Sequence, residues 1–233
     1  MNSIGAYYQV YKNKRATDFV LSKFRDVFPE SPILLISDGG DNFDDLALKH
    51  KTSYVKLYNI FGEQNVDRLY DCERMIEGWR RHKLAVENAQ TEYIMILEDD
   101  VLIQRQFHLG KFDSKGVYVG NYLPADAINE IHNCKGYTNN DQYGMCGGSV
   151  YSSNAFLNSY DSMVKYTNEF HNKLYFNRPH HDPNRKVCAI DCNLVFHFNR
   201  CGFSYSKAEW LSEVLRQNDW KDYPVVHQYK ELY

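Results

Sequence analysis

Two periodicities alternate along the first hundred residues. Four short runs, rich in β-branched and aromatic residues, have the composition of strands and span residues 3–10, 33–36, 52–58 and 93–97. Residues 15–28 and about 72–89 instead carry apolar side chains at the three-to-four-residue spacing of a helix that packs on a core. This order of strands and helices predicts a mostly parallel sheet flanked by helices.

The second half of the chain is less regular. Residues 116–120 and 149–151 have the composition of strands, whereas residues 121–141 are polar and typical of a loop. Ser153 is placed to cap the helix that follows, and another helix is expected to begin at about Asp191. The 233 residues suffice for a sizeable core but not for two ordinary domains, so we expect a single domain over residues 1–233.

Three acids, Glu98, Asp99 and Asp100, directly follow the apolar run at residues 93–97. Adjacent carboxylates at a buried strand end are costly, because like charges repel and burial penalises each charge. A divalent cation relieves this cost, and oxygen ligands suit Mg²⁺ or Mn²⁺. Ligands of open α/β sheets bind at the carboxyl ends of strands, which is where these acids fall. The pattern therefore favours a metal site over the alternative, an acidic turn on the surface.

A resemblance to a known class of enzymes rests on three motifs. The stretch ILEDDV, residues 96–101, resembles the acidic DXD motif of glycosyltransferases with the GT-A fold, in its Glu-Asp-Asp form. The glycine-rich stretch at residues 144–156 and the helix start at Ile190-Asp191 are similar to glycosyltransferases of the collagen-galactosyltransferase and lipooligosaccharide-synthesis type. The resemblance implies a GT-A-like, Rossmann-related α/β fold, in which residues 1–103 bind the nucleotide sugar and residues 104–233 bind the acceptor and form a C-terminal tail.

The resemblance also implies a cofactor and substrates: Mn²⁺ or Mg²⁺, a nucleotide diphosphate sugar, expected to be a UDP-sugar, and a hydroxyl of a glycan or glycoconjugate. Donor-binding roles then fall on the first half of the chain. The base would be flanked by Ala6, Tyr7 and Tyr8, the base or ribose contacted by Asp38, and the diphosphate approached by Arg74 or Lys83. The alternatives are a turn role for Asp38 before two glycines, and a solvated helix face for most of the basic residues, Arg80 and Arg81 included.

By the same resemblance, Asp100 is the direct metal ligand, Glu98 binds the ribose, and Asp99 reaches the donor sugar or a metal-bound water. His227, in the C-terminal tail, would be a second metal ligand; the alternative is an exposed histidine. An inverting transferase needs a carboxylate to accept the proton of the acceptor hydroxyl, and Asp191 is the candidate. Its alternative role is a helix cap, and transfer with retention of configuration stays open.

Composition excludes several classes of function. The formal net charge of −3 argues against general nucleic-acid binding, and no stretch approaches the roughly 20 apolar residues of a membrane span. The first residues lack a secretory signal, and the six cysteines show no zinc-type spacing, so we expect a cytoplasmic protein with reduced thiols. Aromatic residues make up 15% of the chain, which suits the binding of sugars or bases.

Two other functions fit part of the pattern. A nucleotidyltransferase also uses carboxylates and Mg²⁺, but it usually carries a glycine-rich and basic loop after its first strand, where this chain has Tyr7, Tyr8 and Gln9. A non-catalytic sugar- or nucleotide-binding domain would bind a nucleotide tightly without transfer or hydrolysis. We therefore expect a metal-dependent glycosyltransferase, with these two classes as alternatives.

Overall fold

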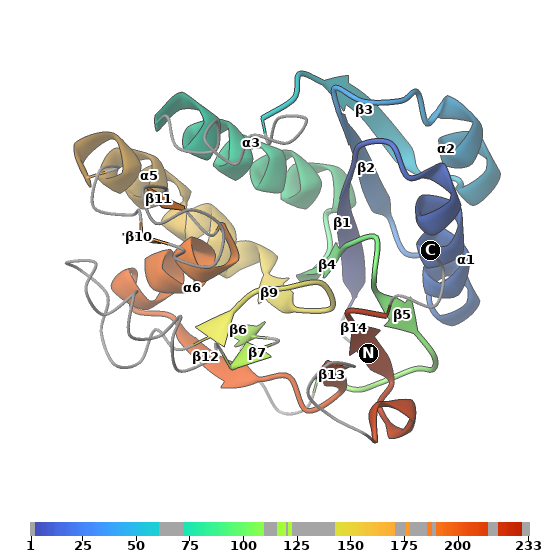
Figure 1. Ribbon diagram of the computed structural model, residues 1–233. Helices are drawn as coiled ribbons and strands as arrows, with labels where there is room; N and C mark the ends of the chain where they lie inside the picture. The colour runs from blue at the N-terminus through green and yellow to red at the C-terminus, as the bar shows by residue number, and fades with distance from the viewer. Residues whose placement is uncertain are drawn as a thin grey trace.

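A seven-stranded sheet forms the centre of the molecule (Figure 1). The computed structural model describes residues 3–60, 72–109, 116–119, 121–122, 143–170, 176–177, 186–187, 190–213 and 219–229. The strand order is β12-β6-β9-β4-β1-β2-β3. These strands span Ile4–Val10 (β1), Ile33–Asp38 (β2), Ser53–Leu57 (β3), Tyr93–Leu97 (β4), Gly116–Val119 (β6), Val150–Ser152 (β9) and Ser204–Lys207 (β12).

The four strands of the first half run parallel, as the alternation of strands and helices predicts. β1 pairs with both β2 and β4, and β2 pairs with β3, all in parallel register. β9 is the exception, because it runs antiparallel to both β4 and β6. All side chains of β2 and β4 are buried, which explains why these runs are apolar at nearly every position.

Helices cover both faces of the sheet (Figure 1). Their bounds are Lys14–Val27 (α1), Asp44–His50 (α2), Cys72–Ala89 (α3), Ser153–Phe170 (α5) and Ile190–Arg200 (α6). Alternate residues of β1 enter the two cores: Ala6 and Tyr8 pack on the side of α1 and α2, and Tyr7 packs on the side of α3 and α5. This mixed α/β architecture, a mostly parallel sheet flanked by helices, confirms the predicted fold class.

One helix was not predicted, and the cap of another differs from the prediction. The seven-residue helix α2 was not predicted, because it is short and its acidic first turn, Asp44 and Asp45, resembles a polar loop. α5 was expected to be capped by Ser153, but Ser153 is its first residue. The cap is Ser152, whose Oγ accepts the backbone N–H of Ala155 at 3.3 Å.

A small second sheet, in the order β13-β14-β5, joins the C-terminal part of the chain to the residues after the acids. It consists of Leu102–Ile103 (β5), Leu211–Glu213 (β13) and Val225–His227 (β14), and a 3₁₀ turn at Trp220–Asp222 precedes its last strand. β14 lies antiparallel to β5, so Val225 is paired with Ile103 and Val226 with Leu102. This pairing carries His227 to the vicinity of the acidic segment.

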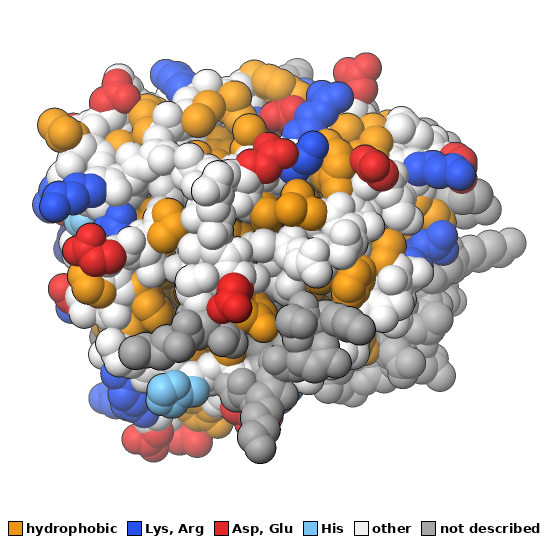
Figure 2. All heavy atoms as spheres, turned by 180° about the vertical axis from the view of Figure 1, so that it is seen from behind, with side chains coloured by type: hydrophobic (Ala, Val, Ile, Leu, Met, Phe, Trp, Pro, Cys, Tyr) orange, Lys and Arg blue, Asp and Glu red, His pale blue; other side chains and the backbone are white. Residues whose placement is uncertain are grey.

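Short two-stranded ladders complete the described elements: Asn121–Tyr122 (β7) pairs with Tyr143–Gly144 (β8), and Phe176–Asn177 (β10) pairs with Lys186–Val187 (β11). On the face seen in Figure 2, Lys and Arg side chains are interspersed with Asp and Glu rather than gathered by sign. Among the helices of the described ranges, none combines the length and the apolar composition that crossing a membrane requires.

Candidate functional site

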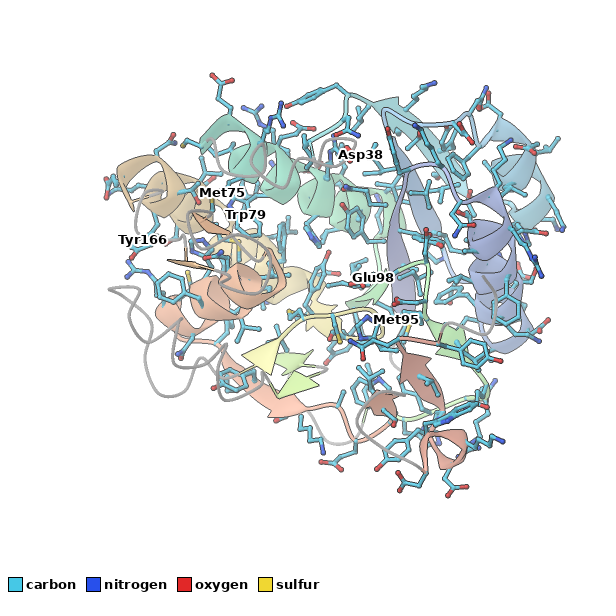
Figure 3. The ribbon with its side chains drawn as sticks, in the orientation of Figure 1. Asp38, Met75, Trp79, Met95, Glu98 and Tyr166 are labelled. Atoms are coloured by element: carbon cyan, nitrogen blue, oxygen red, sulfur yellow. The ribbon has the colours of Figure 1, made fainter. Side chains whose placement is uncertain are left out.

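The carboxyl ends of β4, β1, β2 and β3 lie next to one another along one edge of the sheet, because these strands are parallel neighbours. The acidic segment follows β4, and Asp38 is the last residue of β2. In Figure 3, Glu98 lies near the middle of the molecule, and Asp38 lies apart from it toward the end of β2. This edge therefore gathers Asp38 and the three acids.

Glu98, Asp100 and His227 converge to form a cluster of metal-ligating side chains. One ligand atom from each of the three residues lies within 4.8 Å of the others. His227 Nε2 is 3.2 Å from Glu98 Oε2 and 3.5 Å from Asp100 Oδ1. His227 is 9% exposed, Asp100 21% and Glu98 43%, so the cluster is closed on the protein side and open on the other. Two carboxylates and an imidazole in this arrangement could hold one divalent cation.

The position of His227 is fixed by the chain on both sides of it. Before it, β14 is paired with β5 and β13. After it, the backbone N–H of Tyr229 donates to the carbonyl of Asp100 at 2.9 Å. The Tyr229 ring lies 6.4 Å from the ring of Phe19 and 5.6 Å from that of Trp220. The tail is thus tied directly to the acidic segment and to α1.

The glycine-rich turn packs behind the acids. A Cβ on Gly147 would lie 2.4 Å from a methyl of Val101 and 3.1 Å from Cβ of Glu98, so a larger residue would push the acidic segment away. Gly148 has a φ of +90°, a conformation that favours glycine, and its N–H donates to the carbonyl of Ile96 at 2.8 Å. The glycines of this motif therefore set the position of Glu98.

Asp99, the middle acid, is held by another partner. The hydroxyl of Tyr8 donates to Asp99 Oδ1 at 2.7 Å, and Tyr8 is fully buried. Burial raises the pKa of Asp99, the nearby Asp100 and Glu98 raise it further, and the hydrogen bond from Tyr8 acts in the opposite direction. Asp99 thus contacts the protein interior, while its two neighbours in sequence form the metal-ligating cluster.

The proposed base-flanking residues lie inside the sheet. Ala6, Tyr7 and Tyr8 are 0%, 6% and 0% exposed, and β1 continues beyond them to Val10. Burial raises the pKa of Tyr7 far above its usual range. The structure therefore places these side chains in the two cores of the sheet.

Asp38 is buried and accepts hydrogen bonds from a backbone N–H and from an arginine. The backbone N–H of Ile60 donates to its Oδ1 at 2.8 Å, and the guanidinium of Arg81 donates to the same oxygen at 2.7 Å. Arg81 is fully buried, and it also donates to Glu77 and to the carbonyl of Tyr58. Asp38 is therefore part of a buried ionic network that joins β2, α3 and the segment after β3.

Arg81 is the residue of this site that the sequence interpretation missed. It was assigned to a solvated face of α3, yet it lies on the buried stripe, three residues after Gly78 and four before Ala85. Of the candidates on α3, Arg74 donates to the carbonyl of Ile60 at 3.4 Å, next to this network, and Lys83 is paired with Glu87. Their roles toward a diphosphate stay predictions. Helical spacing places Arg81 on one stripe with Gly78 and Ala85, but only the packing of α3 shows that this stripe faces the end of β2.

Asp191 lies in the first turn of α6. Its side chain is outside the part of the chain that the structure describes, so its place relative to the acidic cluster stays a prediction. The neighbouring residues Asn193 and Leu194 are buried, which fits a helix that begins against the core.

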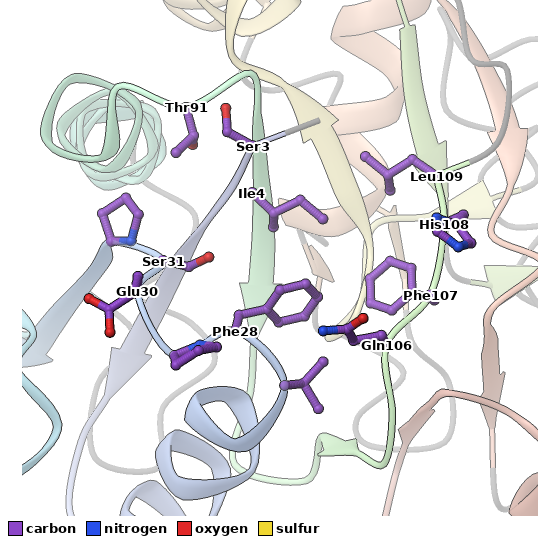
Figure 4. A pocket seen from close by; sticks show the side chains of 13 residues that line it. Ser3, Ile4, Phe28, Glu30, Ser31, Thr91, Gln106, Phe107, His108 and Leu109 are labelled. Atoms are coloured by element: carbon purple, nitrogen blue, oxygen red, sulfur yellow. The ribbon is translucent and has the colours of Figure 1, made fainter. Parts of the chain in front are cut away.

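A cavity of about 710 Å³ lies at the opposite edge of the sheet (Figure 4). It is lined by residues at the amino ends of β1 and β2, such as Ile4 and Pro32, and by Phe28, Phe107 and Leu109. Among the described residues, none of those predicted to bind donor or metal lines this cavity. The acidic edge and this cavity are thus separate features.

Comparisons with known proteins give a similarity of fold. No family model matches the sequence, and no curated protein matches it. A solved structure of the galactosyltransferase LgtC in complex with donor and acceptor sugar analogs aligns with 97% of this chain and 87% of its own, with a TM-score of 0.54 and 11% identity. A structure of an active-site mutant of LgtC aligns with 96% of this chain and 86% of the LgtC chain, with a TM-score of 0.56 and 12% sequence identity. The chain therefore has a GT-A-like fold, and at this identity the similarity is one of fold alone.

Proposed function

We propose that the protein is a metal-dependent glycosyltransferase that moves a sugar from a nucleotide diphosphate sugar, of the UDP class, to a hydroxyl of a glycan or glycoconjugate. The observation that carries this proposal is the convergence of Glu98, Asp100 and His227 at the carboxyl edge of a GT-A-like sheet. Open α/β sheets bind their ligands at this edge. The partly open side of the cluster leaves room for the diphosphate of a donor.

The donor atoms fit a divalent cation. Two carboxylates bring the negative charge that a cation compensates, and the imidazole supplies a third ligand from a different part of the chain. Mg²⁺ is bound almost only by oxygen, so the imidazole favours Mn²⁺ of the two. Glu98, first assigned to the ribose, is thus proposed as a metal ligand. A cation held here would stabilise the negative charge that develops on the departing diphosphate.

Contacts within the chain hold two residues around this site in place. Asp99 is hydrogen-bonded to Tyr8 inside the sheet, whereas Glu98 and Asp100 belong to the cluster. His227 is held in place because its neighbour Tyr229 is bound to the backbone of Asp100. Preorganised ligands of this kind lose little entropy when a substrate binds.

We further propose that the carboxylate of Asp191 accepts the proton of the acceptor hydroxyl, which gives transfer with inversion. The resemblance of the Ile190-Asp191 helix start to glycosyltransferases supports this role, and Asp191 lies in the first turn of α6. Retention is the alternative. NMR of the initial product anomer distinguishes the two, and Asp191→Asn should lower kcat by at least about a hundredfold if the residue is the base. A retained anomer or an unchanged kcat would rule out this role.

Calorimetric titration tests the proposed function. UDP, GDP and their common sugar conjugates are titrated into the wild-type chain and into Asp100→Ala, with and without Mn²⁺. We expect one nucleotide to bind tightly, and this binding to disappear without metal and in the variant. Asp161→Ala is the matched control, because this acid is exposed on α5. Wild-type protein that binds no nucleotide under any condition would refute the proposal.

A transfer assay with the best-binding sugar conjugate separates an enzyme from a non-catalytic binding domain. We expect release of the nucleotide, stimulated by Mn²⁺ and by an acceptor glycan. Tight nucleotide binding without release, over a panel of acceptors, would instead favour the binding domain. Near-normal turnover in Asp100→Ala would contradict the metal assignment.

A further inference from the structure

An exposed aromatic ring lies at the same edge as the acidic cluster. Tyr58 immediately follows Leu57, the last residue of β3, and Leu57 is paired with Asp38 at the end of β2. Tyr58 is 58% exposed, whereas Tyr7 and Tyr8 are buried in the sheet. It is one of four large apolar or aromatic side chains that the described part of the chain leaves exposed. A single exposed ring is common, so its surroundings decide whether it has a role.

The first feature of the surroundings of Tyr58 is a buried cation, Arg81, next to its ring. The guanidinium of Arg81 lies 5.7 Å from the centroid of the Tyr58 ring, within the range of a cation–π contact. Arg81 is itself fully buried and donates to the carbonyl of Tyr58. One group therefore holds both the backbone and the ring of Tyr58, which restricts the orientations that the ring can take.

The second feature is the fixed backbone after Tyr58. The N–H of Ile60 donates to the buried carboxylate of Asp38 at 2.8 Å. Gly39 lies so close to Asn59 that an added Cβ would be 2.7 Å from its backbone nitrogen, and Gly39 has a φ of +71°. The segment from Tyr58 to Ile60 is thus packed against the end of β2. An exposed ring on a fixed backbone suits stacking, because little conformational entropy is lost when a flat ligand binds.

We propose that the ring of Tyr58 is the stacking surface for the base of the bound nucleotide. This inference rests on the proposed function, in which the diphosphate lies at Glu98, Asp100 and His227. β4 and β3 are separated by three strand spacings of about 4.8 Å, or about 14 Å in all. An extended nucleoside diphosphate can cover this distance along the edge, and its base would then reach the end of β3.

Two ligands and three variants test this inference. Calorimetry in the presence of Mn²⁺ measures the Kd of pyrophosphate and of whichever of UDP, GDP, CDP and ADP binds most tightly. The variants are Tyr58→Ala, Tyr58→Phe and the control Leu48→Ala, which removes a side chain that is 84% exposed on α2. Pyrophosphate occupies the metal site but has no base, so it reports any indirect effect on the cluster.

We expect Tyr58→Ala to weaken nucleotide binding about tenfold, the order of magnitude of one aromatic–base stack. Binding of pyrophosphate should be unchanged, and Tyr58→Phe, which keeps the ring, should bind the nucleotide within about twofold of wild type. Equal losses for both ligands, or the same loss in Tyr58→Phe and Tyr58→Ala, would overturn the stacking role. Unchanged nucleotide binding in Tyr58→Ala would overturn it while leaving the proposed function intact. A wild-type chain that binds no nucleotide would refute both.

Discussion

Replacing Arg81 by Met should strongly destabilise the protein. The Arg81 side chain is 0% exposed, and the side chains of its partners Asp38 and Glu77 are 4% and 12% exposed. Methionine fills much of the same volume but carries no charge and donates no hydrogen bond. The substitution therefore removes the buried cation that contacts Asp38 and Glu77, and with it the guanidinium donor to the carbonyl of Tyr58.

The expected cost follows from this geometry. Removing one partner of a buried ion pair costs about 3–5 kcal/mol, because the other charge remains desolvated and uncompensated. That is a large part of a total stability of about 5–15 kcal/mol. For a chain of this size, 1 kcal/mol corresponds to about 2–4 °C in melting temperature, so Arg81→Met should melt about 6–20 °C below wild type.

The control is the preceding residue, Arg80, which has the same side chain at a position about 100° away around the helix, where it is exposed. Its side chain is 63% exposed, and its Nη1 lies 3.9 Å from Glu77 Oε2. Exposed pairs of this kind contribute about 1 kcal/mol or less, so Arg80→Met should stay within that range of wild type. Urea unfolding, followed by circular dichroism, gives both free energies of unfolding with the same reference state.

A third measurement separates charge from packing. In an Asp38→Asn, Glu77→Gln background the partners of Arg81 no longer carry charge, so Arg81→Met should cost less than about 1 kcal/mol there or should stabilise the protein. If Arg81→Met and Arg80→Met differ by less than about 1 kcal/mol in the wild-type background, the buried network is not the stabilising feature described here. Equal costs of Arg81→Met in the two backgrounds would show that packing, not charge, matters.

Three further outcomes are expected. Burial lowers the pKa values of both His82 and His197 to about 3, whereas the unfolded chain, with values near 6.5, binds more protons between these limits. Acidification from pH 7 to pH 5 should therefore cost about 2 kcal/mol of unfolding free energy for each histidine, and in urea titrations His197→Phe should remove its share, about half of the loss from the two. Gly40→Ala should cost about 2–3 kcal/mol in the same assay, because its Cβ would lie 1.8 Å from the carbonyl oxygen of Tyr11. Tyr8→Phe releases Asp99 and should weaken Mn²⁺ binding about tenfold by calorimetry, with an unchanged far-ultraviolet spectrum.

Much of the fold could be predicted from the sequence because its signals are local. The buried strands β2 and β4 are apolar at nearly every position, and α1 and α3 carry apolar stripes at helical spacing. Alternation of such elements leaves few topologies besides a parallel sheet with right-handed crossovers. The shortest elements could not be recognised from the pattern of apolar residues: α2 has seven residues, and β5 and β8 have two each. Such elements form because the surrounding structure provides their partners.

The site was predicted less completely, because its roles depend on which side chains meet. The sequence indicated a basic residue on the helix before the acids, but it could not show that Arg81, rather than Arg74 or Lys83, would face the sheet near Asp38. That choice depends on how α3 is rotated against β1 and β2, which is a property of the packed core. The base-flanking assignment to Tyr7 and Tyr8 likewise depended on where β1 ends, and the strand extends to Val10.

The three acids do not continue strand β4 but form a turn, in which the backbone N–H of Val101 donates to the carbonyl of Glu98 at 3.2 Å. In this turn the side chains of Glu98 and Asp100 meet at the cluster, and Asp99 meets Tyr8. The pattern of apolar and polar residues does not show which of the three side chains points to which side. No local rule could place His227, since 127 positions separate it from Asp100 and only the pairing of β14 with β5 brings them together. Formation of the metal-ligating cluster is therefore coupled to the docking of the C-terminal strand, and the site is complete only once the whole chain has folded.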